Sequence, residues 1–240
     1  MKKNRHITLF IFLAVILVIT GINEVFDLVQ CNMRRSYKSM EDRDIQRIKD
    51  KIAGLEKEQI KDVSTVKRLA DQYALLGRIF LERKMWDQSI ECYLNSEKYG
   101  GNGAAVMYAL GLGYANRGYE HDSDTDFAKA EEYYRKSLEK KAGYDDALYG
   151  LGVLMYYHRN GKEEGLRLVT ELAMKNPAYY PARFAMGRFN YENGDLHKAL
   201  QIYQQLQQDL DRLPKSEIIN NYKEQCSANI ARITTELSVR

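Results

Sequence analysis

The stretch Tyr73-Ala-Leu-Leu-Gly-Arg-Ile-Phe80 places a Leu-Gly pair between two aromatic residues, and similar stretches return three times along the chain. The later copies are Met107-Tyr-Ala-Leu-Gly-Leu-Gly-Tyr114, Leu148-Tyr-Gly-Leu-Gly-Val-Leu-Met155 and, as the poorest match, Arg183-Phe-Ala-Met-Gly-Arg-Phe-Asn190. Self-similarity of this kind is the sequence signature of a repeat architecture. The four glycines therefore mark four copies of one structural unit.

A second motif follows each glycine and fixes the size of the unit. It is a small residue with a bulky one four places later: Ser89/Tyr93, Ala130/Tyr134, Gly165/Val169 and Ala199/Tyr203. From glycine to small residue the distance is 12, 19, 13 and 12 residues, but from small residue to the next glycine it is always 22. The extra residues of the second and third copies must therefore lie inside a repeat, and the connection between repeats is constant.

This pattern resembles the tetratricopeptide repeat, a helix–turn–helix unit of 34 residues, over about residues 66–213. The resemblance implies an all-α fold, a right-handed superhelical solenoid of about four units at 70–103, 104–144, 145–179 and 180–213. Small residues would let the two helices of a unit approach closely. Asn193-Gly194-Asp195 suits the turn between two helices.

The segments on either side of the repeats are predicted to be helical as well. After Pro214, Ser216 is a candidate N-cap for a C-terminal capping helix over 214–240 with apolar residues at helical spacing. Such a helix could also join two copies of the chain in a homo-oligomer. Residues 31–65 read as a polar amphipathic stalk or N-terminal cap, with its apolar face at Ile45, Ile48, Ile52 and Leu55.

The first thirty residues have the pattern of a membrane segment. A basic head precedes Ile7–Ile22, which contains no charged residue. We expect residues 1–30 to form an uncleaved transmembrane signal-anchor, typical of a bacterial inner membrane protein, with the repeats on the periplasmic side. A lipoprotein signal with lipidation at Cys31 is the alternative, and an ordinary cleaved signal peptide is a third reading.

Composition argues against several functional classes. The net charge is +3 with the signs interspersed, which does not favour nucleic-acid binding. Three distant cysteines favour neither a disulfide framework nor a zinc site. The four histidines are dispersed and no nucleophile motif occurs, so we expect no catalytic residues, no metal and no cofactor. The acidic insertion 119–125 lacks the glycine and glutamate of a calcium loop and is predicted to be a solvated loop.

The resemblance also implies where a partner binds, because the first helices of tetratricopeptide units line a concave groove. Carried over position by position, it predicts a groove lined by Arg78, Glu82, Tyr108, Leu112, Asn116, Tyr149, Val153, Tyr156, Tyr157, Phe184, Arg188, Tyr191 and Glu192. Tyrosine and arginine are frequent hot-spot residues of interfaces. The Lys/Asn set that clamps a terminal carboxylate in chaperone-binding relatives is absent.

The sequence thus predicts a membrane-anchored scaffold that binds a partner protein or peptide, in cell-envelope assembly, secretion or chaperone complexes. The alternative is a lipoprotein, lipidated at Cys31, that serves a solute transporter as an accessory ligand-binding component. We expect the double substitution Tyr156→Ala and Arg188→Ala to abolish partner capture without loss of stability.

Overall fold

A computed structural model describes residues 42–58 and 62–239 of the chain. The chain forms two compact units, one up to Gln59 and one from Ile60 onwards. Within the first unit, residues 42–56 are helical, as the amphipathic pattern predicts. The predicted membrane segment 1–30 and the candidate lipidation site Cys31 lie outside the described residues. Within the described ranges, no helix has both the length and the apolar character that a membrane span requires.

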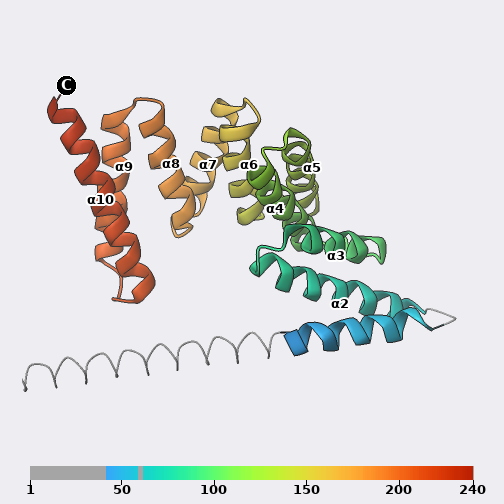
Figure 1. Ribbon diagram of the computed structural model, residues 1–240. Helices are drawn as coiled ribbons and strands as arrows, with labels where there is room; N and C mark the ends of the chain where they lie inside the picture. Colours follow the sequence, from blue (N-terminus) through green and yellow to red (C-terminus); the bar gives the residue numbers. More distant parts are fainter. Residues whose placement is uncertain (1–41, 59–61, 240) are drawn as a thin grey trace, which may run out of the picture. The chain divides into compact units, whose positions relative to one another are not determined.

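The second unit is built from pairs of helices that follow one another along the chain. They are α2 (Val63–Glu82) and α3 (Trp86–Lys98), α4 (Ala104–His121) and α5 (Asp124–Lys140), α6 (Asp145–His158) and α7 (Lys162–Lys175), α8 (Tyr180–Glu192) and α9 (Leu196–Asp211), and the single α10 (Glu217–Val239). Each helix contacts the next (Figure 1). The predicted all-α array of sequential helix pairs is confirmed.

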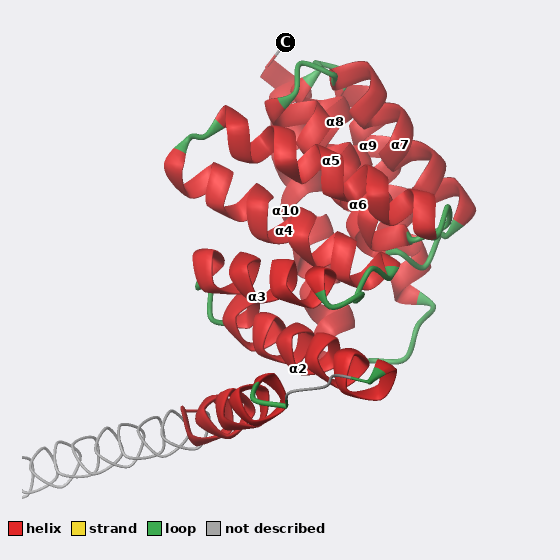
Figure 2. Ribbon diagram, turned by 90° about the vertical axis from the view of Figure 1, so that its right-hand side faces the viewer, coloured by secondary structure: helices red, strands yellow, loops and turns green. Residues whose placement is uncertain are grey.

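The first helix of each pair lies on the inner side of the array. α2 contacts α4, α4 contacts α6 and α6 contacts α8, whereas no two second helices are in contact in the described part of the chain. Elements that crowd together on one side of a stack lie on its inner curvature. Figure 2 shows these elements from a second direction, with short loops joining them. A site on the inner side is therefore built mainly from α2, α4, α6 and α8.

Close approach within each pair depends on the repeated glycine. A Cβ added at Gly111 of α4 would lie 2.6 Å from Cδ1 of Tyr134 on α5, closer than real Cβ contacts allow. In the third pair both helices carry a glycine at the contact, and a Cβ added at Gly165 on α7 would lie 2.5 Å from the carbonyl oxygen of Gly152 on α6. The predicted role of the small residues in helix packing is confirmed.

The acidic insertion is not a loop, and that prediction was wrong. α4 continues to His121 and α5 already begins at Asp124, so only Asp122 and Ser123 separate the two helices. The reason is one apolar residue that follows the acidic stretch, Phe127, which packs into the core. Phe127 is buried and its ring stacks on the imidazole of His158, with the ring centres 4.0 Å apart. The additional residues therefore lengthen the helices.

The C-terminal helix covers the last repeat, as predicted. Ser216 caps its start, because the backbone N–H of Ile219 donates to the Ser216 hydroxyl at 3.2 Å. Cys226 and Ile233 are fully buried in a cluster with apolar residues of α9. The apolar face that could have joined two copies of the chain is thus occupied by α9, and self-association through α10 stays a prediction.

Candidate functional site

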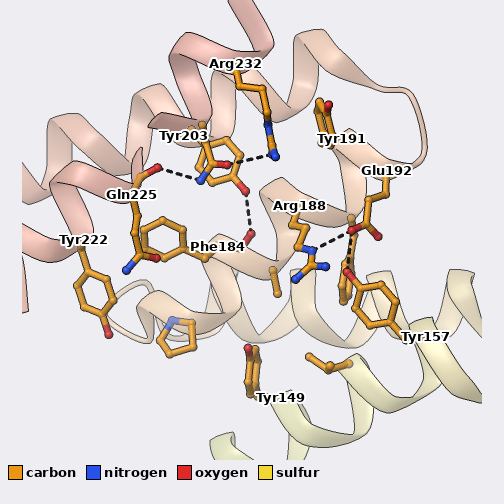
Figure 3. A pocket seen from close by; sticks show the side chains of 15 residues that line it. Tyr149, Tyr157, Phe184, Arg188, Tyr191, Glu192, Tyr203, Tyr222, Gln225 and Arg232 are labelled. Carbon is orange, nitrogen blue, oxygen red and sulfur yellow. Dashed lines mark hydrogen bonds and ion pairs between the residues drawn. The ribbon is translucent and has the colours of Figure 1, made fainter. Parts of the chain in front are cut away.

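The inner side of the array carries a cavity of about 570 Å³ near its C-terminal end, here called the C-terminal cavity (Figure 3). α6, α8 and α10 supply nearly all of its lining, and α9 adds one tyrosine. Aromatic rings dominate the wall: Tyr149, Tyr157, Phe184, Phe189, Tyr191, Tyr203 and Tyr222. Arg188, Arg232, Glu192, Gln225 and Asn229 add polar groups.

α8 contributes one face of the helix to this wall. Pro181, Phe184, Arg188 and Tyr191 recur every three or four residues, and side chains at this spacing lie on the same side of an α-helix. Ala182 and Phe189 of α8 are buried in the core, and Phe189 also borders the cavity. Repeat packing therefore fixes which side chains of α8 point into the cavity.

α10 contributes a second stripe that the sequence analysis missed. Tyr222, Gln225, Asn229 and Arg232 follow one another at intervals of three and four residues and line the cavity. The helical spacing of this stripe was visible in the sequence. The surface that this stripe faces could not be predicted, because only the fold shows that α10 passes opposite α8.

Side chains bridge α10 and α8 at both ends of the cavity. At one end the Tyr222 ring lies 5.5 Å from the ring of Phe184, measured between centres. At the other end the Tyr191 hydroxyl donates to Glu236 at 2.9 Å. The cavity is the space left between these two bridges.

The two arginines of the cavity have different surroundings. Arg188 donates from Nε to Glu192 at 2.8 Å, and its guanidinium lies 5.2 Å from the centre of the Tyr157 ring. Arg232 lies 4.4 Å from the centre of the Tyr191 ring. Arg188 is thus neutralised by a neighbour, whereas no carboxylate of the described residues forms an ion pair with Arg232.

Tyr149, Tyr157 and Tyr203 are neutral hydrogen-bonding groups of the site. Burial raises the pKa of Tyr157, and the hydrogen bond that its hydroxyl donates to Glu192 at 2.9 Å raises it further. Burial also raises the pKa of Tyr149 and takes that of Tyr203 to about 12. These phenols stay protonated at neutral pH, so they can donate hydrogen bonds and stack but cannot act as bases. Across the described residues there is no cluster of metal-binding side chains.

The predicted groove residues separate into two groups. Tyr149, Tyr157, Phe184, Arg188 and Tyr191 lie together in the C-terminal cavity, with the predicted neighbours Val153 and Glu192. Arg78, Tyr108 and Asn116 lie outside it, on α2 and α4. Arg78 is exposed beside Glu82, Tyr108 packs edge-on against Tyr144, and the Asn116 amide donates to the carbonyl of Leu112.

Tyr156 is a core residue, and its predicted place on the groove surface was wrong. Its side chain is only 2% exposed, and its ring stacks on Phe189 with the centres 3.7 Å apart. Its hydroxyl shares one hydrogen between two acceptors, the Phe189 carbonyl at 3.1 Å and Oδ1 of Asn193 at 2.9 Å. Because α7 carries Val169 where the other second helices carry tyrosine, Tyr156 fills the space between the third and fourth repeats.

Comparison with solved structures identifies the architecture. The structure matches that of a tetratricopeptide repeat protein from Parabacteroides merdae ATCC 43184 with a TM-score of 0.61 and 15% identity, over 85% of this chain and 75% of that one. The fold is that of a tetratricopeptide repeat protein. Two other matches are BtubC from P. vanneervenii (TM-score 0.56, 12% identity, 82% and 92% covered) and MamA (TM-score 0.53, 13% identity, 84% and 95% covered).

No protein-family model and no curated protein matches the chain by sequence. Helical repeat arrays in general present an extended concave surface, which such proteins use for binding. The C-terminal cavity is the part of that surface where aromatic and arginine side chains gather in this chain.

Proposed function

We propose that this protein is a membrane-anchored tetratricopeptide scaffold that binds a peptide segment of a partner protein in the C-terminal cavity. The observation that carries the proposal is the cavity itself, with its aromatic wall and its two arginines on the inner side of the array. Its volume of about 570 Å³ falls in the range of roughly 300–1,000 Å³ typical of ligand pockets. A peptide would bury its side chains there against rigid rings.

The lining residues suit a binding hot spot. Tyrosine buries a large area with few rotatable bonds and keeps a polar group for orientation. Arginine offers five N–H donors in a fixed plane and can stack on an aromatic ring. Hot spots concentrate such residues in concave, desolvated places. The packed helices hold these side chains in place before a ligand arrives, which reduces the entropic cost of binding.

The membrane anchor is part of the proposal and rests on the sequence of residues 1–30. The uncharged run Ile7–Ile22 behind a basic head favours a signal-anchor, with the repeats on the periplasmic side of a bacterial inner membrane. In that position the scaffold would recruit its partner close to the membrane, in cell-envelope assembly, secretion or chaperone complexes. Labelling of cells with a radioactive fatty acid tests the anchor, because incorporation that is lost in Cys31→Ser would identify a lipoprotein.

Crosslinking and affinity capture with the intact, membrane-embedded protein tests the binding function. The informative variant is Tyr157→Ala with Arg188→Ala, because both side chains line the cavity and neither is buried in the core. The control variant is Arg167→Ala on α7, whose guanidinium pairs with Glu171 outside the cavity. We expect specific partners to be captured by the wild type and by the control, and lost with the cavity variant. Equal capture by all three forms would contradict binding in the C-terminal cavity.

A further inference from the structure

Arg232 has hydrogen-bonding capacity that the structure leaves unused. A guanidinium has five N–H donors and cannot lose its charge in a protein. One donor, on Nη2, reaches Oδ1 of Asn229 at 3.0 Å. That oxygen is held towards Arg232, because the Asn229 amide nitrogen donates to the Gln225 carbonyl at 2.9 Å. In the described part of the chain Arg232 forms no ion pair, so its charge is available to a ligand.

The guanidinium of Arg232 lies over the ring of Tyr191. The guanidinium carbon lies 4.4 Å from the centre of the Tyr191 ring, within the distance of a favourable cation–π contact. A guanidinium that lies against a ring keeps N–H donors at its edge with which it can bind a planar acceptor. A carboxylate can accept two parallel N–H bonds from that edge.

Arg188 reaches the same space from the opposite helix (Figure 3). Glu192 accepts from Nε of Arg188 and from the Tyr157 hydroxyl on the same carboxylate oxygen, at 2.8 and 2.9 Å. The Nη groups of Arg188 take no part in these bonds. With two guanidiniums and one carboxylate, the charged lining of the cavity has a net positive charge. Charge complementarity therefore favours an anionic group in the ligand.

Much of the remaining wall is aromatic or aliphatic. Tyr149 and Val153 of α6, Phe184 of α8 and Tyr222 of α10 line the same cavity as the two arginines. The Phe184 and Tyr222 rings are 5.5 Å apart and inclined by 35°, and both belong to the cavity wall, where an aromatic group of a ligand would find ring partners. A ligand that complements both the arginines and the aromatic part of the wall carries an acidic group next to an aromatic one.

We propose that the C-terminal cavity recognises an acidic side chain adjacent to an aromatic side chain in the bound peptide. Arg232, assisted by Arg188, holds the carboxylate, and the ring lies against Phe184, Tyr222 and Tyr149. The inference rests on the proposed function and specifies its ligand. It makes α10 one half of the recognition site in addition to the cap of the array.

Peptide binding to the full-length protein in a nonionic detergent tests this inference. The probes are fluorescein-labelled octapeptides with amidated C-termini, Gly-Ser-Phe-Glu-Glu-Phe-Ser-Gly and its Gln-Gln and Lys-Lys counterparts, followed by fluorescence anisotropy. We expect the Glu peptide to bind at least about tenfold more tightly than the Gln peptide, the difference expected for one charge-assisted contact. Its affinity should fall as sodium chloride is added, because salt screens the contact.

Single substitutions test which residues cause the preference for the Glu peptide. Arg232→Gln should weaken binding of the Glu peptide by about tenfold and leave the Gln peptide almost unaffected. Tyr222→Ala should weaken both peptides by a similar factor, since the ring contact does not depend on charge. Arg167→Gln, a matched change on α7 outside the cavity, should change neither.

Several outcomes would overturn the inference. Equal affinity for the Glu and Gln peptides would do so, and so would a Glu preference that survives Arg232→Gln. Tight binding of the Gln peptide once its C-terminus is a free carboxylate would make the chain end the ligand. Displacement of the Glu peptide by phosphatidylglycerol vesicles, but not by phosphatidylcholine vesicles, would make a lipid surface the occupant. The crosslinking capture decides the proposed function separately, so specific capture without a Glu preference would reject only the inference.

Discussion

Single glycines set the separation of the paired helices, and Gly111 allows this to be tested. Gly111→Ala would place a methyl group 2.6 Å from Cδ1 of the buried Tyr134 ring. The ring cannot move aside without disturbing its neighbours, so we expect a loss of about 1–3 kcal/mol in the free energy of unfolding. Urea denaturation followed by circular dichroism measures it.

Gly103 provides the matched control in the same repeat. Nothing lies within 4 Å of a Cβ added at Gly103, which is the N-cap of α4. Gly103→Ser adds a hydroxyl that can cap the helix, so its stability should be equal to the wild type or slightly higher. If Gly111→Ala were no more destabilising than Gly103→Ser, the close approach of α4 and α5 would not be needed.

Substitution of Tyr156 tests whether its side chain belongs to the core. Tyr156→Ala removes a buried ring stacked on Phe189 and should cost about 3–5 kcal/mol of unfolding free energy. Tyr156→Phe keeps the stack and loses the hydroxyl hydrogen that the Phe189 carbonyl and Asn193 share, at a cost of about 1–3 kcal/mol. Thermal unfolding of both variants gives the comparison. An unchanged melting temperature in Tyr156→Ala would contradict the burial of this side chain in the core.

Groups of charged residues hold successive helices together, and Arg117 is the most connected of them. From α4 it donates two hydrogen bonds to Asp126 on α5, at 2.8 and 2.7 Å, and one to Asp87 on α3, at 2.7 Å. Asp126 is buried. Removal of one member would leave a buried charge without its partner, which is costly. The network therefore ties the first repeat to the second.

The pH dependence of stability tests this network. The hydrogen bonds from Arg117 lower the pKa of Asp126 below its ordinary value. The folded state then prefers the charged form, so the stabilisation is present above about pH 4, the unfolded value, and is lost as pH falls through the folded pKa. Asp126→Asn should be less stable than the wild type at pH 7, and the difference should shrink as the pH is lowered below about 4. Parallel melting curves from pH 7 downwards would show it, and a constant difference would contradict the assignment.

The sequence predicted the helix pairs well because each pair is defined by local spacing. The interval from the small residue of one repeat to the glycine of the next is always 22 residues, as from Ser89 to Gly111, and it identified the connection between repeats. Interactions that depend on how one helix is rotated against another were not predictable. The hydroxyls of Ser96 and Ser137 donate to the carbonyls of Ala70 and Ala104 at 2.8 Å, a bond repeated in the first two pairs. No local pattern marks these serines as partners of a distant backbone.

The candidate site was predicted only in part, because its lining comes from helices that are far apart in the sequence. Tyr149, Phe184 and Arg188 could be placed on the inner surface since each follows the repeat pattern. Arg232 lies on α10, outside any repeat, and its place opposite Arg188 depends on how the last helix returns along the array. Tyr156 was misplaced because Val169 changes the packing of one repeat.

Removal of the last helix tests how far the whole array depends on it. A chain that ends at Leu213 loses the cover of Tyr203, Leu206 and Leu210, which α10 now shields through Cys226 and Ile233. Repeat arrays need a cap with a polar outer face for solubility. We expect the shortened protein to aggregate on size-exclusion chromatography and to lose partner capture. A soluble, monomeric product that still captures the partner would show that α10 is dispensable for both.

Because α10 contacts α9 and also lines the cavity, occupancy of the cavity is linked to local opening of α10. Terminal elements of a fold open locally more easily than its centre, and their amide protons exchange with solvent sooner. A ligand that bridges Arg232 and Arg188 binds only when α10 is docked, so by mass action it suppresses that opening. The amides of α10 should then exchange more slowly as ligand is added, while those of α4 stay unchanged. The end of the array would report on binding through its own protection from exchange.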